Sequence, residues 1–177
     1  FPGALSADEA RADRRQSVFT GDFGDQETTT WRIGGRYALG PAWQAEFEYS
    51  ERDMDGDAFQ GGPQWGAPNT SEMTVRTASP RRVGALPVST GDALVTVGLD
   101  WTDSEYLLDI PLYYFRTDFA QEQQDLYAQV VYPLTRTVHV SAGARRSEVD
   151  DDNRGTDRRN SDGETITTAA LAWQFRE

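Results

Sequence analysis

Two short acidic runs hold the side chains of this sequence that are best suited to binding a cation. They contain six aspartates: Asp53, Asp55 and Asp57, then Asp150, Asp151 and Asp152. Carboxylate oxygens are the ligands that calcium prefers, but an EF-hand loop also needs a closing Glu. At that position the two runs have Gln64 and Ser161. We therefore interpret both runs as solvated acidic loops with candidate ligand contacts, and keep calcium binding as an alternative.

The remaining reactive side chains give no case for catalysis. His139 is the only histidine and the chain has no cysteine, which excludes a structural zinc site built from Cys and His ligands. The sequence has no G-x-S-x-G elbow, no phosphate-binding loop and no H-E-x-x-H motif. We therefore predict a protein that is not an enzyme, and no cofactor is implied.

Period-two alternation positions these residues and predicts an all-β chain. Apolar and polar residues alternate over six ranges: 31–39, 43–50, 93–101, 126–134, 138–145 and 170–175. Residues 70–79 and 106–117 also look extended, though less regularly. We count roughly eight to ten strands, and no helix beyond a turn or two over 6–14.

The polar face of these strands carries a second set of candidate site residues. They are Arg32, Arg36, Glu46, Glu48, Gln129, His139 and Arg145. In a wide barrel they would line a water-filled lumen, whereas in a soluble barrel or sandwich they would lie on the surface. The alternation is the same in both cases, so this pattern leaves both architectures open.

The lengths of the connections favour a membrane barrel. Tight turns at 39–42 and 133–136 contrast with long polar stretches at 51–69 and 148–164. Short periplasmic turns and long extracellular loops are typical of bacterial outer-membrane barrels. We therefore predict an antiparallel transmembrane β-barrel portion, with the two stretches as candidate capture loops.

The pairs Arg81-Arg82 and Arg158-Arg159 are predicted to be loop residues, with contacts to lipopolysaccharide phosphates or an anionic ligand as the alternative.

Composition limits the partners and the class of protein. The chain has 17 basic and 29 acidic residues, a net charge of −12 that disfavours nucleic acid. Mean hydropathy is −0.66, and no run approaches the ~20 apolar residues of a membrane-spanning helix. Because the start at Phe1 lacks the features of a secretion signal, we expect residues 1–177 to be one β-barrel segment of a larger barrel.

Aromatic residues recur near the ends of the predicted strands. They are Trp31, Tyr37, Trp43, Tyr49, Trp101, Tyr132, Trp173 and Phe175. In a membrane barrel such residues form girdles at the two interfaces with water. The alternative is that they are core residues of a soluble sandwich.

Three segments share the pattern of a known family. The hairpin at 125–145 joins DLYAQVVYPLT to VHVSAGAR, the strand at 164–175 reads ETITTAALAWQF, and residues 1–15 read FPGALSADEARADRR. These segments resemble the TonB-dependent receptors, whose recurrent hairpin joins a YAQ-type strand through a P-L-T turn to an S-A-G-x-R strand. Residues 1–15 are similar to the PGALT-type loop that precedes a barrel strand in many members.

The resemblance implies active uptake across the outer membrane of a Gram-negative bacterium. Extracellular loops would capture a scarce ligand such as a ferric siderophore or cobalamin, and TonB would act through a plug. The plug and the TonB box are missing from this sequence, and the family barrel closes with roughly 22 strands. Outer-membrane lipid and lipopolysaccharide are the other implied partners. A passive porin or small structural outer-membrane barrel is one alternative, and a soluble all-β binding protein is another.

Overall fold

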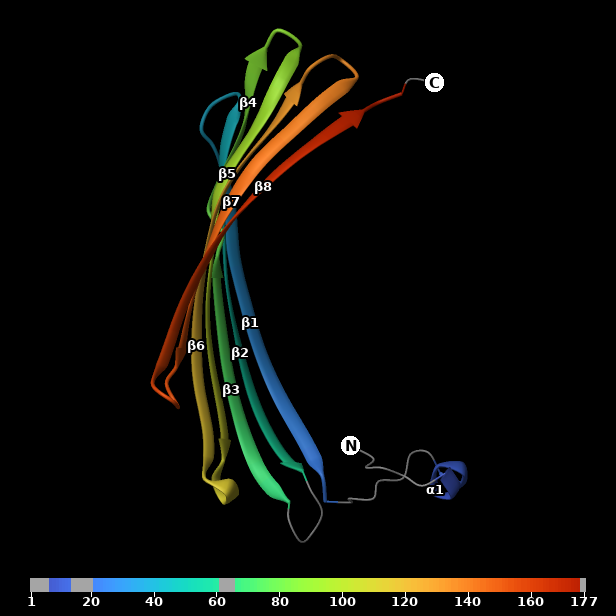
Figure 1. Cartoon of the computed structure of the whole chain (residues 1–177), viewed down its shortest axis with the longest axis vertical. Coiled ribbons are helices and arrows are strands. Elements are labelled where there is room, and N and C mark those ends of the chain that lie inside the picture. Colours follow the sequence, from blue (N-terminus) through green and yellow to red (C-terminus); the bar gives the residue numbers. More distant parts are fainter. Residues whose placement is uncertain (1–6, 14–20, 61–65, 176–177) are drawn as a thin grey trace.

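The computed structural model of the chain is built almost entirely of strands (Figure 1), and it describes residues 7–13, 21–60 and 66–175. The strands are β1 (Phe23–Ala38), β2 (Trp43–Gln60), β3 (Ala67–Ala78), β4 (Arg81–Val88), β5 (Gly91–Ile110), β6 (Phe115–Pro133), β7 (Val138–Asn153) and β8 (Arg158–Trp173). A short helix, α1 (Ala7–Ala12), precedes them, and one 3-10 turn, η1 (Pro111–Tyr113), joins β5 to β6. The short helix predicted within 6–14 and the extended range 70–79 are confirmed. The extended range 106–117 is confirmed only in part, because η1 interrupts it between β5 and β6. Among the described residues, no helix is both long and apolar enough to cross a membrane.

The strands form one antiparallel sheet in the order β1-β2-β3-β5-β6-β7-β8, in which β4 lies beside β3 in the chain direction and pairs, like β3, with β2 and β5. β3 and β4 act as a single strand, because Tyr49 pairs with Ala78 and Glu46 pairs with Arg81 in one continuous register. The interruption falls at Pro80, which has no backbone N–H to donate. The ladder resumes around it, since the Leu99 N–H donates to the Pro80 carbonyl at 3.0 Å. The sheet is therefore an up-and-down meander.

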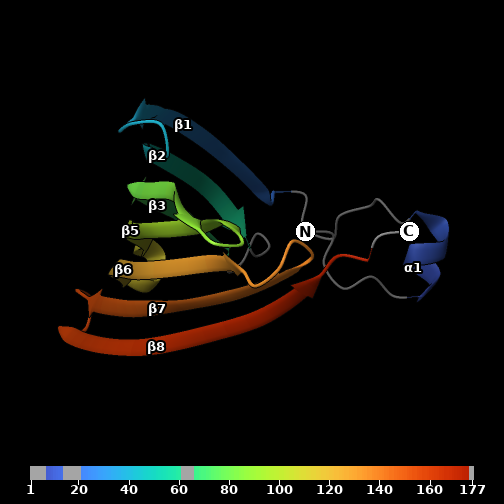
Figure 2. The same ribbon diagram turned by 90° about the horizontal axis from the view of Figure 1, so that it is seen from above.

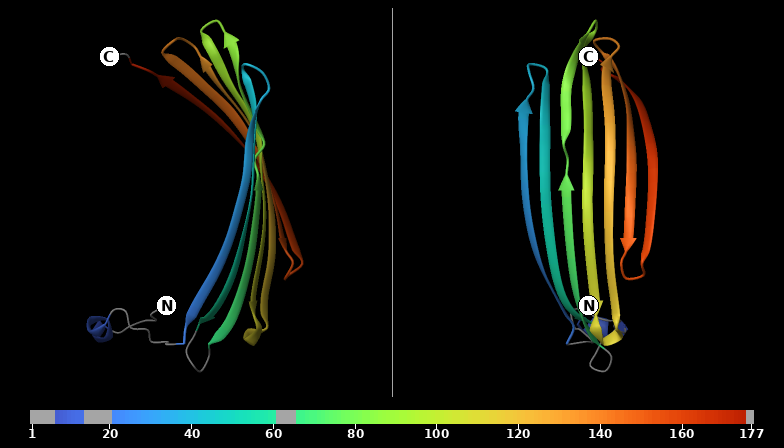
Figure 3. Two further views of the ribbon diagram at one scale, coloured as in Figure 1. Left: turned by 180° about the vertical axis from the view of Figure 1, so that it is seen from behind. Right: turned by 90° about the vertical axis from the view of Figure 1, so that its left-hand side faces the viewer.

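The sheet curves into an open arc. Seen from above, the strands from β1 to β8 follow one another along a curved row (Figure 2). The side views show the strands running as long, twisted ribbons over most of the length of the molecule (Figure 3). In the described part of the chain, β1 pairs only with β2 and β8 only with β7, so each leaves one edge without a strand partner.

Over the described residues, the prediction of two long loops is wrong; residues 61–65 of the first lie outside the described part of the chain. Most of the stretch 51–69 belongs to β2 and β3, and most of 148–164 belongs to β7 and β8. Aspartate and glycine made these stretches look like loops, yet their backbones pair residue by residue, as in Asp53 with Thr74 and Asp151 with Asn160. Tertiary pairing overrides the weak intrinsic strand preference of these residues. The connection from β7 to β8 is only 154–157, and the tight turns at 39–42 and 133–136 are confirmed, the latter as 134–137 between β6 and β7.

The described part of the chain has almost no apolar core. Its buried apolar residues are Ala67 and Ala93, at 5% and 3% exposure, whereas Ile33, Leu126 and many other large apolar side chains are exposed. A soluble sandwich would bury one face of its sheet against a second layer. The structure has one layer, so its apolar side chains need another apolar environment.

Most of the apolar side chains of the strands form one continuous band on a single face of the sheet. The register aligns them as follows: Trp31, Ile33 and Tyr37 on β1; Trp43, Ala45, Phe47 and Tyr49 on β2; Ala78, Pro80, Gly84 and Leu86 on β3 and β4; Ala93, Val95, Val97, Leu99 and Trp101 on β5; Leu126, Ala128, Val130 and Tyr132 on β6; Val138, Val140, Ala142 and Ala144 on β7; and Ala169, Leu171 and Trp173 on β8. On β5 this apolar band runs from Ala93 to Trp101, about the length of a tilted strand that crosses a bilayer.

Candidate functional site

The face opposite the apolar band carries all seven residues of the polar candidate set. Cross-strand pairing links Arg36 to Glu46, Glu46 to Arg81, and Tyr127 to Arg145 along one row. Arg32, Glu48, Gln129 and His139 stand on the same side, because paired residues in an antiparallel sheet point to the same face. We call this side the charged face. Its central part, with Arg36, Glu46, Arg81, Asp125 and Arg145, is the charged cluster.

Glu46 lies at the centre of one half of the cluster. Its carboxylate accepts from Arg36 Nε at 3.2 Å and from the guanidinium of Arg81 at 2.5 Å. Gln44 donates to the same carboxylate at 2.8 Å, and the Glu46 side chain is only 11% exposed. A hollow of about 510 Å³ lies over this group, lined also by Asp100 and Tyr127. The outer pair, Arg32 and Glu48, is looser at 3.5 Å and largely exposed.

Asp125 anchors the other half and is the only buried charged residue in the described part of the chain, at 3% exposure. Its Oδ2 accepts from Arg145 at 2.5 Å and from Gln123 at 2.8 Å. Its Oδ1 is also buried but has no hydrogen-bond partner among the described residues. A buried carboxylate oxygen without a donor is costly, so this atom can accept a donor from a group bound on the charged face.

The structure brings some of the candidates together and leaves others apart. Arg36 with Glu46, and Arg145 with Asp125, are joined by ion pairs, whereas no hydrogen bond or ion pair among the described residues links Gln129 or His139 to the cluster. His139 pairs with Pro133 and Ala172 close to the turn between β6 and β7.

Sequence reasoning missed three polar residues of the charged face. Arg81 was predicted to lie in a loop, but it belongs to β4 and points to the opposite face from Arg82, its neighbour. Asp125 falls just before the predicted strand 126–134, although β6 begins ten positions earlier, at Phe115. Asp100 lies in a recognised strand, and its polar character within the alternation was a signal that could have identified it.

The six candidate aspartates lie in strands, contrary to the prediction that they lie in loops. Asp53, Asp55 and Asp57 belong to β2 and Asp150, Asp151 and Asp152 to β7. Five of them share the face of the apolar band but lie beyond its aromatic end. Asp151 alone points to the charged face, where it accepts from Gln121 at 2.8 Å.

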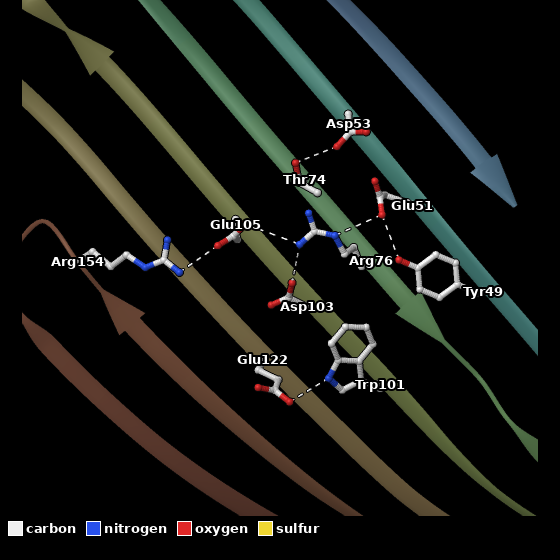
Figure 4. Close-up of polar contacts among 10 residues, drawn as sticks. All are labelled: Tyr49, Glu51, Asp53, Thr74, Arg76, Trp101, Asp103, Glu105, Glu122 and Arg154. Carbon is white, nitrogen blue, oxygen red and sulfur yellow. Dashed lines mark hydrogen bonds and ion pairs between the residues drawn. The ribbon is translucent and has the colours of Figure 1, made fainter.

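Beyond Tyr49 and Trp101, the face of the apolar band becomes densely charged. We call this region the collar; it contains Glu51, Asp53, Asp55, Asp57, Arg76, Asp103, Glu105, Glu122, Asp150, Asp152, Arg154 and Arg159. Arg76 is at its centre (Figure 4), contacting Glu51 at 3.3 Å, Asp103 at 3.1 Å and Glu105 at 3.8 Å. The pKa of Arg76 is raised above its usual value, mainly because its guanidinium is hydrogen-bonded to Asp103.

Further contacts tie the collar to neighbouring strands and to the aromatic end of the band. Arg154 binds Glu105 at 3.0 Å, and Thr74 donates to Asp53 at 2.9 Å (Figure 4). The indole N–H of Trp101 donates to Glu122 at 2.9 Å, so this ring has an apolar body and a polar edge. Such a ring suits the boundary between lipid and water. Among the described residues, no group of three or more His, Cys, Asp or Glu is arranged to hold a metal ion.

Comparison with known sequences gives no match. No protein-family model matches the chain, and no curated protein matches it.

Comparison with solved structures identifies the fold. The chain is similar to the ferric citrate transporter FecA in its unliganded form, with a TM-score of 0.75 and 15% identity over 97% of this chain and 28% of that one. It is also similar to a closed form of the ferric-catecholate import receptor Fiu from E. coli K12, with a TM-score of 0.59 and 12% identity over 96% of this chain and 34% of that one. The chain thus spans about a third of the length of these proteins. The predicted fold class, an antiparallel transmembrane β-barrel portion, is confirmed.

Proposed function

We propose that this chain is part of the wall of an outer-membrane receptor that takes up a scarce ligand by TonB-dependent active transport. The observation that carries the proposal is the division of one sheet into a lipid-length apolar band on one face and a charged cluster on the other. The likeness in fold to a ferric citrate transporter and a ferric-catecholate import receptor supports it. The ligand class we propose is a ferric siderophore, cobalamin or a compound of similar size.

The apolar band fits a position against the hydrocarbon of the Gram-negative outer membrane. Trp31, Tyr49 and Trp101 end it on one side, and Trp43 and Trp173 end it on the other, as interfacial girdles do. The strands continue past the band at the collar end. We assign this end to the cell exterior, because outer-membrane barrels extend further beyond the bilayer on that side than on the periplasmic side. The collar then lies at the level of lipopolysaccharide, and the tight turns at 39–42 and 134–137 lie in the periplasm.

The charged cluster fits a position in the lumen of the barrel, in contact with a plug that has a polar surface. Ion pairs at Glu46 and Asp125 preorganise its side chains, and the unpartnered Asp125 Oδ1 can accept a donor from a plug packed inside the barrel. TonB would act through that plug. Asp151, which points to the same face, is the aspartate we retain as a candidate contact for the ligand; the other five face outward with the collar.

The two unpaired edges separate this proposal from its alternatives. Lipid does not tolerate exposed backbone N–H and C=O groups, so β1 and β8 require further strands as neighbours in a membrane. We propose that the rest of a larger barrel provides them, which disfavours a small structural barrel made from this chain alone. The absence of an apolar core in the described residues disfavours a soluble binding protein. A passive porin needs an open lumen and no plug.

Uptake measurements on the producing bacterium test the proposed function. We expect deletion of the gene to abolish energy-dependent accumulation of one of three labelled probes: ferric citrate, a ferric catecholate or cobalamin. A plasmid copy of the gene should restore that accumulation, and a protonophore should remove it again, because active transport depends on the inner-membrane proton gradient.

Two results would contradict active transport. One is an unchanged, protonophore-insensitive accumulation of all three probes in the deletion strain. The other is rapid diffusion of small sugars through vesicles containing the purified full-length protein, which is the behaviour of an open porin.

A further inference from the structure

Arg82 is a charged residue among the apolar residues of the band. It lies on β4 between Pro80 and Gly84 and pairs with Ala45 and Val97, all of which are residues of the band. Its side chain is exposed. Arg146, which pairs with Leu126 on the same face, is bound to Glu148 at 3.2 Å. Nine other arginines form ion pairs, but Arg82 has no carboxylate partner in the described part of the chain. A charge facing lipid is costly unless it reaches a polar headgroup.

The surroundings of Arg82 direct it toward one end of the band. Its guanidinium carbon lies 4.5 Å from the centre of the Trp43 ring, at the end of the band nearest the turn 39–42. The Trp43 ring lies flat over Gly84, in space that a Cβ at that position would occupy. The missing side chain of Gly84 therefore leaves room for the Trp43 ring, and the Trp43 ring in turn supports the guanidinium of Arg82. Stacking of this kind leaves the guanidinium N–H groups free for an anion.

A groove lies beside this pair. It has a volume of about 570 Å³, and its lining on the face of the band includes Tyr37, Ala45, Phe47, Pro80 and Val97. Gly35 and Pro80 lie at the bottom of the groove, and neither has a large side chain that would fill it. The groove is mostly apolar. Arg36, Glu46 and Arg81 also contribute to its lining, but the register places their side chains on the charged face, whereas Arg82 stands on the face of the band.

We propose that this groove binds a diacyl glycerophospholipid of the periplasmic leaflet, with Arg82 contacting the phosphate and one acyl chain lying along the groove. The two parts of the site complement the two parts of such a lipid. The apolar groove suits an acyl chain, and the guanidinium beside it, which has no carboxylate partner among the described residues, can bind a phosphate through two parallel N–H groups. Snorkelling toward Trp43 brings the guanidinium to the level of the headgroups. The inference rests on the membrane position given under the proposed function, but not on the transport activity.

Native mass spectrometry of the full-length protein in detergent tests the proposal. Titration with phosphatidylglycerol is expected to give one retained lipid on the wild type, and Arg82→Gln should weaken this binding on the order of tenfold. Arg82→Lys should retain part of the affinity, and Trp43→Leu should weaken it. The matched control is Arg136→Gln, because Arg136 is an exposed arginine without an ion-pair partner in the described part of the chain that lies outside the groove, in the turn between β6 and β7.

Two further probes separate the parts of the ligand. Diacylglycerol has the chains but no phosphate, and glycerol 3-phosphate has the phosphate but no chains, so neither should be retained. Equal retention by Arg82→Gln and the wild type would overturn the proposal, as would an equal loss in Arg136→Gln, which would indicate non-specific adhesion. A wild type that does not partition into detergent or vesicles at all would overturn the membrane position itself, an outcome distinct from failure of the lipid site.

Discussion

Replacing Val130 by arginine is expected to lower the free energy of unfolding by about 3 kcal/mol, whereas the same change at the adjacent Gln129 should leave it nearly unchanged. Val130 lies within the apolar band and pairs with Val95 and Ala142, so its replacement places a charge against lipid near the middle of the bilayer. Gln129 is exposed on the charged face, where an arginine remains in water. The two positions are neighbours on one strand, which makes each the control for the other.

Urea unfolding of the protein in phospholipid vesicles, followed by tryptophan fluorescence, measures both free energies. Each variant should be compared with the wild type at the same lipid composition, since burial in the bilayer contributes to stability. Equal losses at the two positions, or a larger loss for Gln129→Arg, would contradict the assignment of the faces.

The second large effect is expected at Asp125. Arg145→Met removes the guanidinium that binds its buried carboxylate. It leaves a charge at 3% exposure to which the Gln123 amide still donates at 2.8 Å. Losing the partner of a fully buried charge is strongly destabilising, but Arg145 itself is about half exposed, at 48%. We therefore expect a loss of about 2 kcal/mol, between the values typical of exposed and of buried pairs.

A double-mutant cycle assigns this loss to the pair. Asp125→Asn combined with Arg145→Met should recover much of the stability, because the neutral amide no longer needs the cation. Arg32→Met is the matched control: its pair with Glu48 is 3.5 Å long and exposed on both sides, so its loss should cost less than about 0.5 kcal/mol. If the double variant is as unstable as the sum of the two single variants, Arg145 and Asp125 are not energetically coupled.

The alternation of residues predicted most of the strands and their two faces. Trp31 to Leu39 and Trp43 to Tyr49 repeat with a period of two, which is the geometry of a pleated strand, so the charged candidates were correctly grouped on one face. Whether that face lines a lumen could not follow from alternation, because a soluble barrel shows the same pattern. The open single layer and the missing core distinguish the two.

The length of the strands could not be predicted in the same way. Asp53 to Asp57 carries no apolar residue on the face of the band, so the periodic signal disappears where the strand leaves the hydrocarbon. Only cross-strand pairing, such as Asp53 with Thr74, shows that the strand continues. For the same reason the parts of the collar at 51–57 and 150–159 were predicted to be loops, and Arg82 was predicted to be one of a pair of loop arginines after Ser79-Pro80.

The most direct test of the central claim, that the apolar band faces lipid and the charged face faces water, uses single cysteines along β6. The chain has no native cysteine, so a spin label placed at each position from Leu126 to Tyr132 reports on that position alone. In vesicles, we predict that collisions with oxygen peak at Leu126, Ala128, Val130 and Tyr132, and that collisions with a water-soluble nickel chelate peak at the positions between them. Loss of this alternation, or the opposite phase, would contradict the account.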